Sequence, residues 1–200
     1  MSLIARPALL RGKNVVASVI MLLATLSAGQ GLSATNSGSS VAHQARALPS
    51  LCNLSEVPLF QCAIGAKQLA ICAGDVSSQG VVQYRYGAPG KLELVYPAAP
   101  QTGAASLKWA MTGYSGGGET QVSFDRSGVE YVVYSRMTRT GFGKDGHNDP
   151  KDELGVAVLK GDHLVSDRRC GVAKIEGGHS DWIDEQRTMR LLPKGEFVDH

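Results

Sequence analysis

The sequence predicts an all-β fold, an antiparallel β-sandwich or barrel with a minor C-terminal helix, and three observations support this prediction. From Phe60 onward, short segments rich in Val, Leu, Ile and Tyr recur at intervals of roughly 8–12 residues. Turn-forming Gly, Pro, Asp and Ser separate these segments, and no helical period lies between them. In residues 129–136, Val129, Tyr131 and Val133 alternate with a mixed set of side chains, as expected for a strand with one buried face. This pattern favours antiparallel pairing over alternating βα units.

The N-terminus of this 200-residue chain is typical of an export signal. Arg6, Arg11 and Lys13 precede an uncharged apolar stretch at residues 15–28. This stretch is shorter than the about 20 apolar residues that span a bilayer, but it suits a secretory signal. Small residues follow, so we expect cleavage between residues 28 and 34 and assign residues 1–34 to a signal peptide. An uncleaved membrane anchor is the alternative.

Residues 35–50 are polar, small and aperiodic, which predicts a flexible leader before a single β-rich domain at residues 51–200. Three of the 20 basic residues precede residue 35, whereas all 18 acidic residues follow it, so the mature chain has a formal charge of −1. This balance does not indicate a nucleic-acid or anionic-membrane partner. We therefore expect a periplasmic or secreted protein with no nucleic-acid partner and no stable membrane insertion after signal cleavage.

All four cysteines, Cys52, Cys62, Cys72 and Cys170, lie in the mature part. An even number in an exported chain predicts two disulfides, and three pairings are compatible with the sequence. We expect Cys170 to join the last hairpin to the first strands through Cys62 or Cys72. The intervals fit no C-x₂₋₄-C zinc pattern, so neither a metal nor a cofactor is expected.

Eight segments are expected to be strands: Gln68–Cys72, Val81–Tyr86, Lys91–Tyr96, Leu107–Thr112, Gln121–Phe124, Val129–Met137, Gly155–Leu159 and His163–Ser166. Residues 125–128 (DRSG) predict a tight turn, and residues 160–162 (KGD) predict another hairpin. Residues 141–153 are expected to form a long solvated loop, with a calcium site on its carboxylates as the alternative. Residues 181–192 have helical spacing and end before Pro193, which predicts a short helix docked by Trp182.

Gly113-Tyr114-Ser115-Gly116-Gly117 matches the G-x-S-x-G pattern of serine hydrolases. That chemistry needs a serine on a strained strand-to-helix turn beside a histidine base and an acid. The residues after Gly118 are strand-like, and His43 in the leader provides no recognisable base. A glycine-rich turn is therefore favoured, with a secreted hydrolase using Ser115 as the alternative. No histidine pair or carboxylate pair has catalytic spacing, so neither an enzyme nor a catalytic residue is expected.

Ser127-Gly128-Val129-Glu130-Tyr131 resembles the S-G-x-x-Y segment of bacterial periplasmic lysozyme inhibitors. The resemblance implies a small exported antiparallel-β protein whose serine loop enters the lysozyme cleft and hydrogen-bonds the catalytic carboxylates. It assigns partner binding to Ser127 and Gly128, with Tyr131 as the support of the loop. Leu159-Lys160-Gly161-Asp162 is similar to the T-K-G-D/E turn of some inhibitors, although Leu159 departs from that pattern.

The expected function is thus an exported periplasmic protein-binding module, in its sharpest form an inhibitor of lysozyme or another cell-wall hydrolase. An immunity protein against an exported toxin belongs to the same physical class. An ordinary hairpin at residues 127–131, in a structural envelope protein without an active site, is the further alternative.

Overall fold

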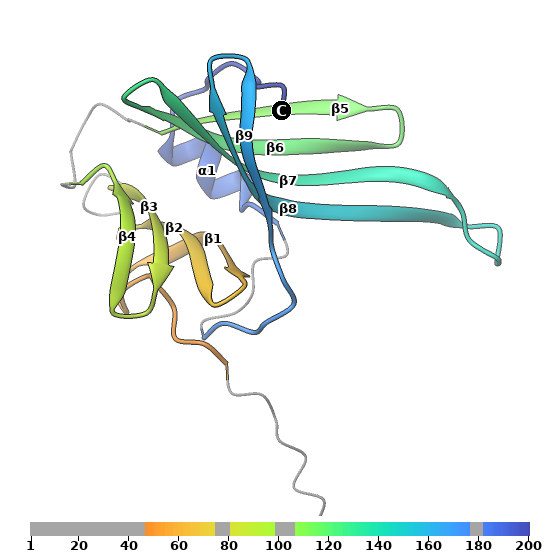
Figure 1. Cartoon of the computed structure of the whole chain (residues 1–200). Coiled ribbons are helices and arrows are strands. Elements are labelled where there is room, and N and C mark those ends of the chain that lie inside the picture. Colours follow the sequence, from red (N-terminus) through yellow and green to blue (C-terminus); the bar gives the residue numbers. More distant parts are fainter. Residues whose placement is uncertain (1–46, 75–80, 99–106, 177–181) are drawn as a thin grey trace, which may run out of the picture. The chain divides into compact units, whose positions relative to one another are not determined.

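The computed structural model describes residues 47–74, 81–98, 107–176 and 182–200, where nine strands form two antiparallel sheets (Figure 1). The first sheet has the order β1-β2-β3-β4 and the second the order β5-β6-β7-β8-β9, so each strand pairs with its neighbours in sequence. The prediction of an all-β fold with one short C-terminal helix is confirmed, and the arrangement is a sandwich. The signal peptide predicted at residues 1–34 lies outside the described residues.

The strands of the first sheet are β1 (Val57–Ile64), β2 (Lys67–Ala73), β3 (Val82–Ala88) and β4 (Lys91–Tyr96). Those of the second are β5 (Lys108–Tyr114), β6 (Gly117–Arg126), β7 (Val129–Phe142), β8 (Asn148–Lys160) and β9 (His163–Arg169). All but β1 overlap a segment expected from the sequence. Pro58 makes β1 hard to recognise, because proline is tolerated in a strand only at a bulge or an edge, and the register of β1 shifts just after it.

The inner faces of the two sheets pack against each other around one hydrophobic core. In the first sheet, a row of paired positions carries Phe60, Ile71, Tyr84 and Tyr96; in the second, a row carries Phe124, Tyr131, Val158 and Ser166. The rings of Tyr84 and Phe124 meet across the sandwich with centroids 5.0 Å apart. Tyr131 and Val133 both join this core, so the alternation predicted for β7 is confirmed on this face.

The other face of the second sheet is covered by the C-terminal tail, which the sequence did not indicate. The backbone N–H of Trp109 donates to the Pro193 carbonyl at 3.0 Å, and the Gly195 N–H donates to the Trp109 carbonyl at 2.7 Å, so the tail runs beside β5. Val132 and Tyr134 lie on this face and are only 0% and 1% exposed. The middle of this face is therefore buried as well, whereas Glu130 and Arg136 on either side of it stay partly exposed.

The C-terminal helix α1 (Glu185–Leu191) lies within the predicted segment. Asp184 caps it by accepting a hydrogen bond from the Arg187 N–H at 3.0 Å. The anchor differs from the prediction: Ile183 and Leu192 are buried, whereas Trp182 is 37% exposed. Trp182 therefore does not dock the helix.

Residues 141–153 are not the long loop that the sequence predicts. β8 begins at Asn148, inside that segment, and only residues 143–147 remain as the connection between β7 and β8. β6 pairs with β7 only as far as Met137, and β9 pairs with β8 only from Gly155 onward. Beyond these residues β7 and β8 pair with each other alone, so the outer part of the hairpin is a two-stranded arm (Figure 1). Pro150 pairs with Arg139 in this arm, where a proline is tolerated because the other edge of β8 is open.

Two disulfides close the fold, Cys52–Cys72 and Cys62–Cys170. The second joins β1 to the segment just after β9, which confirms the expectation that Cys170 bonds to an early strand and selects Cys62. Leu48, which the sequence assigned to the flexible leader, is hydrogen-bonded to the segment after β9. Its N–H donates to the Lys174 carbonyl, and its carbonyl accepts from the Glu176 N–H. The ordered domain thus extends into the predicted leader.

Candidate functional site

The turn between β6 and β7 carries the two residues that the sequence singled out for partner binding. Arg126 pairs with Val129, so Ser127 and Gly128 form a two-residue hairpin loop. Their φ angles are 57° and 76°, both in the left-handed region, as in a type I′ turn. Ser127 is the one residue other than glycine with a positive φ in the described ranges. The Gly128 N–H donates to Asp125 Oδ1 at 3.2 Å and so fixes the turn from below.

The Ser127 side chain is exposed, as are all four residues of the turn from Asp125 to Gly128. Its hydroxyl has no hydrogen-bond partner within the described part of the chain. A serine hydroxyl can donate one hydrogen bond and accept others, so this group remains free to serve both a donor and an acceptor.

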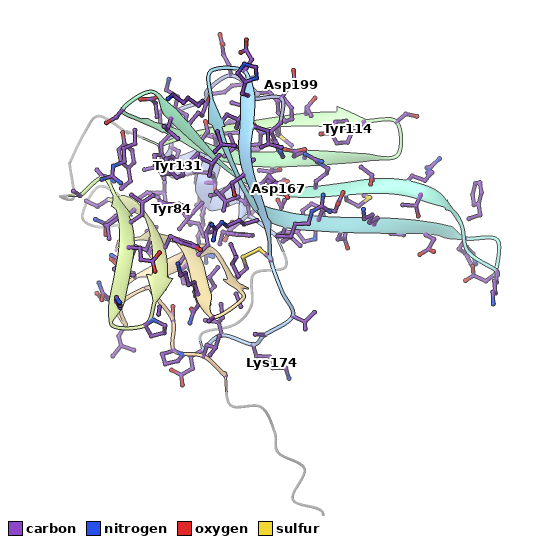
Figure 2. All side chains as sticks on the ribbon, viewed as in Figure 1. Tyr84, Tyr114, Tyr131, Asp167, Lys174 and Asp199 are labelled. Atoms are coloured by element: carbon purple, nitrogen blue, oxygen red, sulfur yellow. A yellow bond between two sulfur atoms is a disulfide. The ribbon has the colours of Figure 1, made fainter. Side chains whose placement is uncertain are left out.

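Tyr131 lies below the turn, with its ring inside the sandwich. The ring stacks on Phe124 with centroids 4.9 Å apart and an interplanar angle of 3°. Tyr84 approaches it from the first sheet, with centroids 6.3 Å apart, and Figure 2 shows the two tyrosines at this junction. Phe124 stacks in turn on Tyr96 at 4.3 Å. The strands that carry the turn are therefore fixed by aromatic contacts from both sheets.

The second segment of the resemblance lies at the same end of the sheet. Leu159 pairs with Glu130 near the start of β7, so the turn between β8 and β9 emerges at the same end as the Ser127–Gly128 turn. Gly161 in this second turn has a φ of 58°. Leu159, which departs from the family pattern, is buried against Val132 and Ala157 on the face that the tail covers.

Ser115 lies in the turn between β5 and β6, where Tyr114 pairs with Gly117. This is a strand–turn–strand connection, whereas the nucleophile elbow requires a helix after the serine. Among the described residues, no histidine or carboxylate hydrogen-bonds to Ser115. Gly116 has a φ of 96°, which accounts for a glycine in this turn.

The most elaborate polar arrangement is one that the sequence did not reveal. The Glu119 side chain is fully buried on the tail-covered face of the second sheet. It accepts hydrogen bonds from Tyr114 Oη at 2.7 Å, Gln121 Nε2 at 2.7 Å and Arg136 Nε at 2.5 Å, and His200 Nε2 lies 2.9 Å from its Oε1. Arg136 and His200 are 17 and 81 residues away from Glu119 in the sequence, so no local sequence pattern predicts the cluster.

The electrostatics of this cluster suit an anchor better than a catalyst. Burial alone would raise the pKa of Glu119, but hydrogen bonds from His200, Arg136, Gln121 and Tyr114 outweigh it and lower the pKa to about 2. Burial, together with the hydrogen bond to Glu119, raises the pKa of Tyr114 to about 12. Both groups keep one protonation state at neutral pH, which does not suit proton transfer.

The only grouping of potential metal ligands in the described residues is Cys52, Glu56 and Cys72. The two sulfurs are bonded to each other, and both Glu56 oxygens accept hydrogen bonds from Arg85 at 2.6 and 2.7 Å. These side chains are therefore engaged in structural contacts.

Comparison with known proteins finds no family model, no curated protein and no solved structure that matches this chain. The two disulfides suggest an oxidising, exported location. No helix in the described ranges is long and apolar enough to cross a membrane.

Proposed function

We propose that this chain is an exported, periplasmic or secreted protein-binding module that inhibits a cell-wall hydrolase, with lysozyme as the target class. The proposal is carried by the geometry of the Ser127–Gly128 turn: an exposed, unpartnered hydroxyl on a backbone held in the left-handed region. The Tyr131–Phe124 stack below supports the same strands. A loop that is already rigid loses little conformational entropy on binding, which favours affinity.

The chemistry of a lysozyme cleft suits this hydroxyl. Such a cleft presents two carboxyl groups, one ionised and one kept protonated as the general acid. Ser127 Oγ would donate to the ionised carboxylate and accept from the protonated one. Gly128, which has no side chain, would let the backbone approach the cleft closely.

Inhibition assays test the proposal directly. The purified mature domain is expected to inhibit at least one of the c-, g- and i-type lysozymes at micromolar concentration or below. Ser127→Ala should weaken inhibition by roughly 1–3 kcal/mol, because it leaves the partner carboxyl groups without a hydrogen-bond partner.

Lys151→Ala on the two-stranded arm is the matched control, since this exposed side chain lies far along β8 from the turn and its loss should leave inhibition unchanged. If no lysozyme class is inhibited, the lysozyme proposal is wrong. If Ser127→Ala inhibits as well as the native protein, the turn is not the binding element.

A further inference from the structure

A cleft opens between the two sheets, next to the aromatic junction. It encloses about 330 Å³, and Tyr84 and Tyr86 from β3 and Tyr131 from β7 contribute to its walls. Val156 and Val158 from β8 add apolar surface. Sites for small organic ligands typically measure roughly 300–1,000 Å³ and are mostly apolar, with a few polar groups that orient the ligand. The volume of the cleft lies near the lower end of this range, and its lining combines apolar side chains with several polar and charged ones.

Two arginines give the cleft its charge. Arg126, at the end of β6, and Arg168, on β9, both line it. Arg168 is oriented by its neighbours, since Nη1 donates to Tyr86 Oη at 3.0 Å and Nε donates to Ser166 Oγ at 3.4 Å. Its Nη2 has no partner in the parts of the chain that the structure describes.

The charge of these two arginines is not neutralised within the described residues. Four other arginines each lie beside a carboxylate: Arg85, Arg136, Arg169 and Arg187. Neither Arg126 nor Arg168 has a carboxylate partner in the described ranges. Glu93 also lines the cleft, but Lys67 Nζ holds its Oε2 at 2.7 Å. The cleft therefore offers two cations without their anion.

We infer that this cleft binds a small free organic anion, with a ring-sized apolar body against the tyrosines and a carboxylate group at Arg168, while Arg126 adds positive charge to the same cleft. Arginine is suited to this role because its planar donors match a carboxylate. Tyr86 and Ser166, which already hold Arg168, would fix the position of the carboxylate. This inference goes beyond the proposed inhibitor function, because it requires neither the Ser127 hydroxyl nor a protein partner.

The test uses a matched pair of probes, 1-naphthaleneacetate and its neutral amide, titrated into the disulfide-bonded protein and followed by backbone amide NMR shifts. The acid should bind and shift amides in residues 84–86, 156–158 and 166–168. The amide should bind about tenfold more weakly, the cost of losing one charge-assisted hydrogen-bonded contact.

Arg168→Gln and Arg126→Gln, examined separately, should each weaken binding of the acid by up to about tenfold. Arg139→Gln removes an exposed charge on the two-stranded arm and should leave binding unchanged. Ser127→Ala should also bind the acid normally, which separates this site from the proposed inhibitor turn. Equal binding of acid and amide, shifts outside the cleft, or no binding at millimolar concentration would overturn the inference. The inference would also be overturned if Arg168→Gln and Arg126→Gln both bound the acid as well as the native protein does.

Discussion

At the scale of single residues, Glu119 shows what a buried carboxylate requires. A charge removed from water is stable only when hydrogen-bond donors replace the lost solvent. Tyr114, Gln121, Arg136 and His200 supply four such contacts, and they connect three strands and the tail through one carboxylate. The stability of this face should therefore depend on pH through Glu119.

The direction of that dependence follows from the pKa. Glu119 has a pKa of about 2 in the fold and of about 4.5 when unperturbed, so the unfolded chain takes up the proton first as the pH falls. The stabilising contribution is fully present above the unperturbed pKa and is lost as the pH falls toward 2. Glu119→Gln should lower the free energy of unfolding at neutral pH by about 3 kcal/mol, because partly buried Arg136 loses its charged partner and the new amide NH2 faces hydrogen-bond donors. Urea unfolding at a series of pH values measures this loss, which should shrink in acid.

Glu93→Gln is the control for this experiment, since Glu93 forms an exposed ion pair with Lys67 that is worth less than about 1 kcal/mol. Equal losses in the two variants, or a Glu119→Gln effect that does not change with pH, would contradict the buried-anchor interpretation.

Among the residues of the candidate site, Ser127, Gly128 and Tyr131 could be found from the sequence because they lie within one hairpin. D-R-S-G predicts a tight turn from local backbone preferences alone. Glu119 and the cleft arginines could not be found this way. Their partners lie on strands and a tail that are distant from them in the sequence, and neither composition nor local pattern predicts such contacts.

At the scale of elements, the β6–β7 turn places Gly128, which adopts a positive φ easily, next to Ser127, which does not. Type I′ turns favour Asn-Gly because both central residues have positive φ, and serine tolerates that region less well than asparagine. Ser127→Asn should therefore raise the free energy of unfolding by roughly 0.5–1 kcal/mol. Thermal and urea unfolding measure the change, and Gly128→Ala, at φ 76°, should lower stability as the opposite control.

The same Ser127→Asn variant should weaken lysozyme inhibition, so stability and inhibition are expected to move in opposite directions. A loss of stability in Ser127→Asn would mean that the serine makes a contact that favours it in the turn, against the geometry described above.

The strand elements were predictable where turn signals bounded them and were misjudged where proline lay inside them. β4 matches its predicted range, whereas β8 extends seven residues before the predicted start at Gly155. Pro150 and the neighbouring acidic residues have low strand propensity. They are accommodated because the outer arm has open edges, which is a property of sheet order and not of local sequence.

At the scale of the whole molecule, the contact between the sheets depends on the shared core and on one covalent link. Within each sheet, neighbours in sequence pair directly, so the chain itself constrains them closely. Cys62 and Cys170, by contrast, are 108 residues apart and connect β1 to the end of the second sheet. Which cysteines pair depends on how the two sheets meet, and this explains why the sequence left three pairings open.

The two disulfides should therefore contribute unequally to stability. In the chain-entropy model, a cross-link stabilises more when it closes a longer loop, about 4.7 kcal/mol for 100 residues against about 3 kcal/mol for 15. The sequence separations here are 108 for Cys62–Cys170 and 20 for Cys52–Cys72. Replacing Cys62 and Cys170 together by alanine should thus lower the free energy of unfolding by more than the same replacement of Cys52 and Cys72.

Urea unfolding of the two double variants, each with the other bridge intact, measures the difference, and thiol titration of the native protein should find no free cysteine. An equal or reversed order would mean that the native core, and not the length of the closed loop, determines what each bridge contributes.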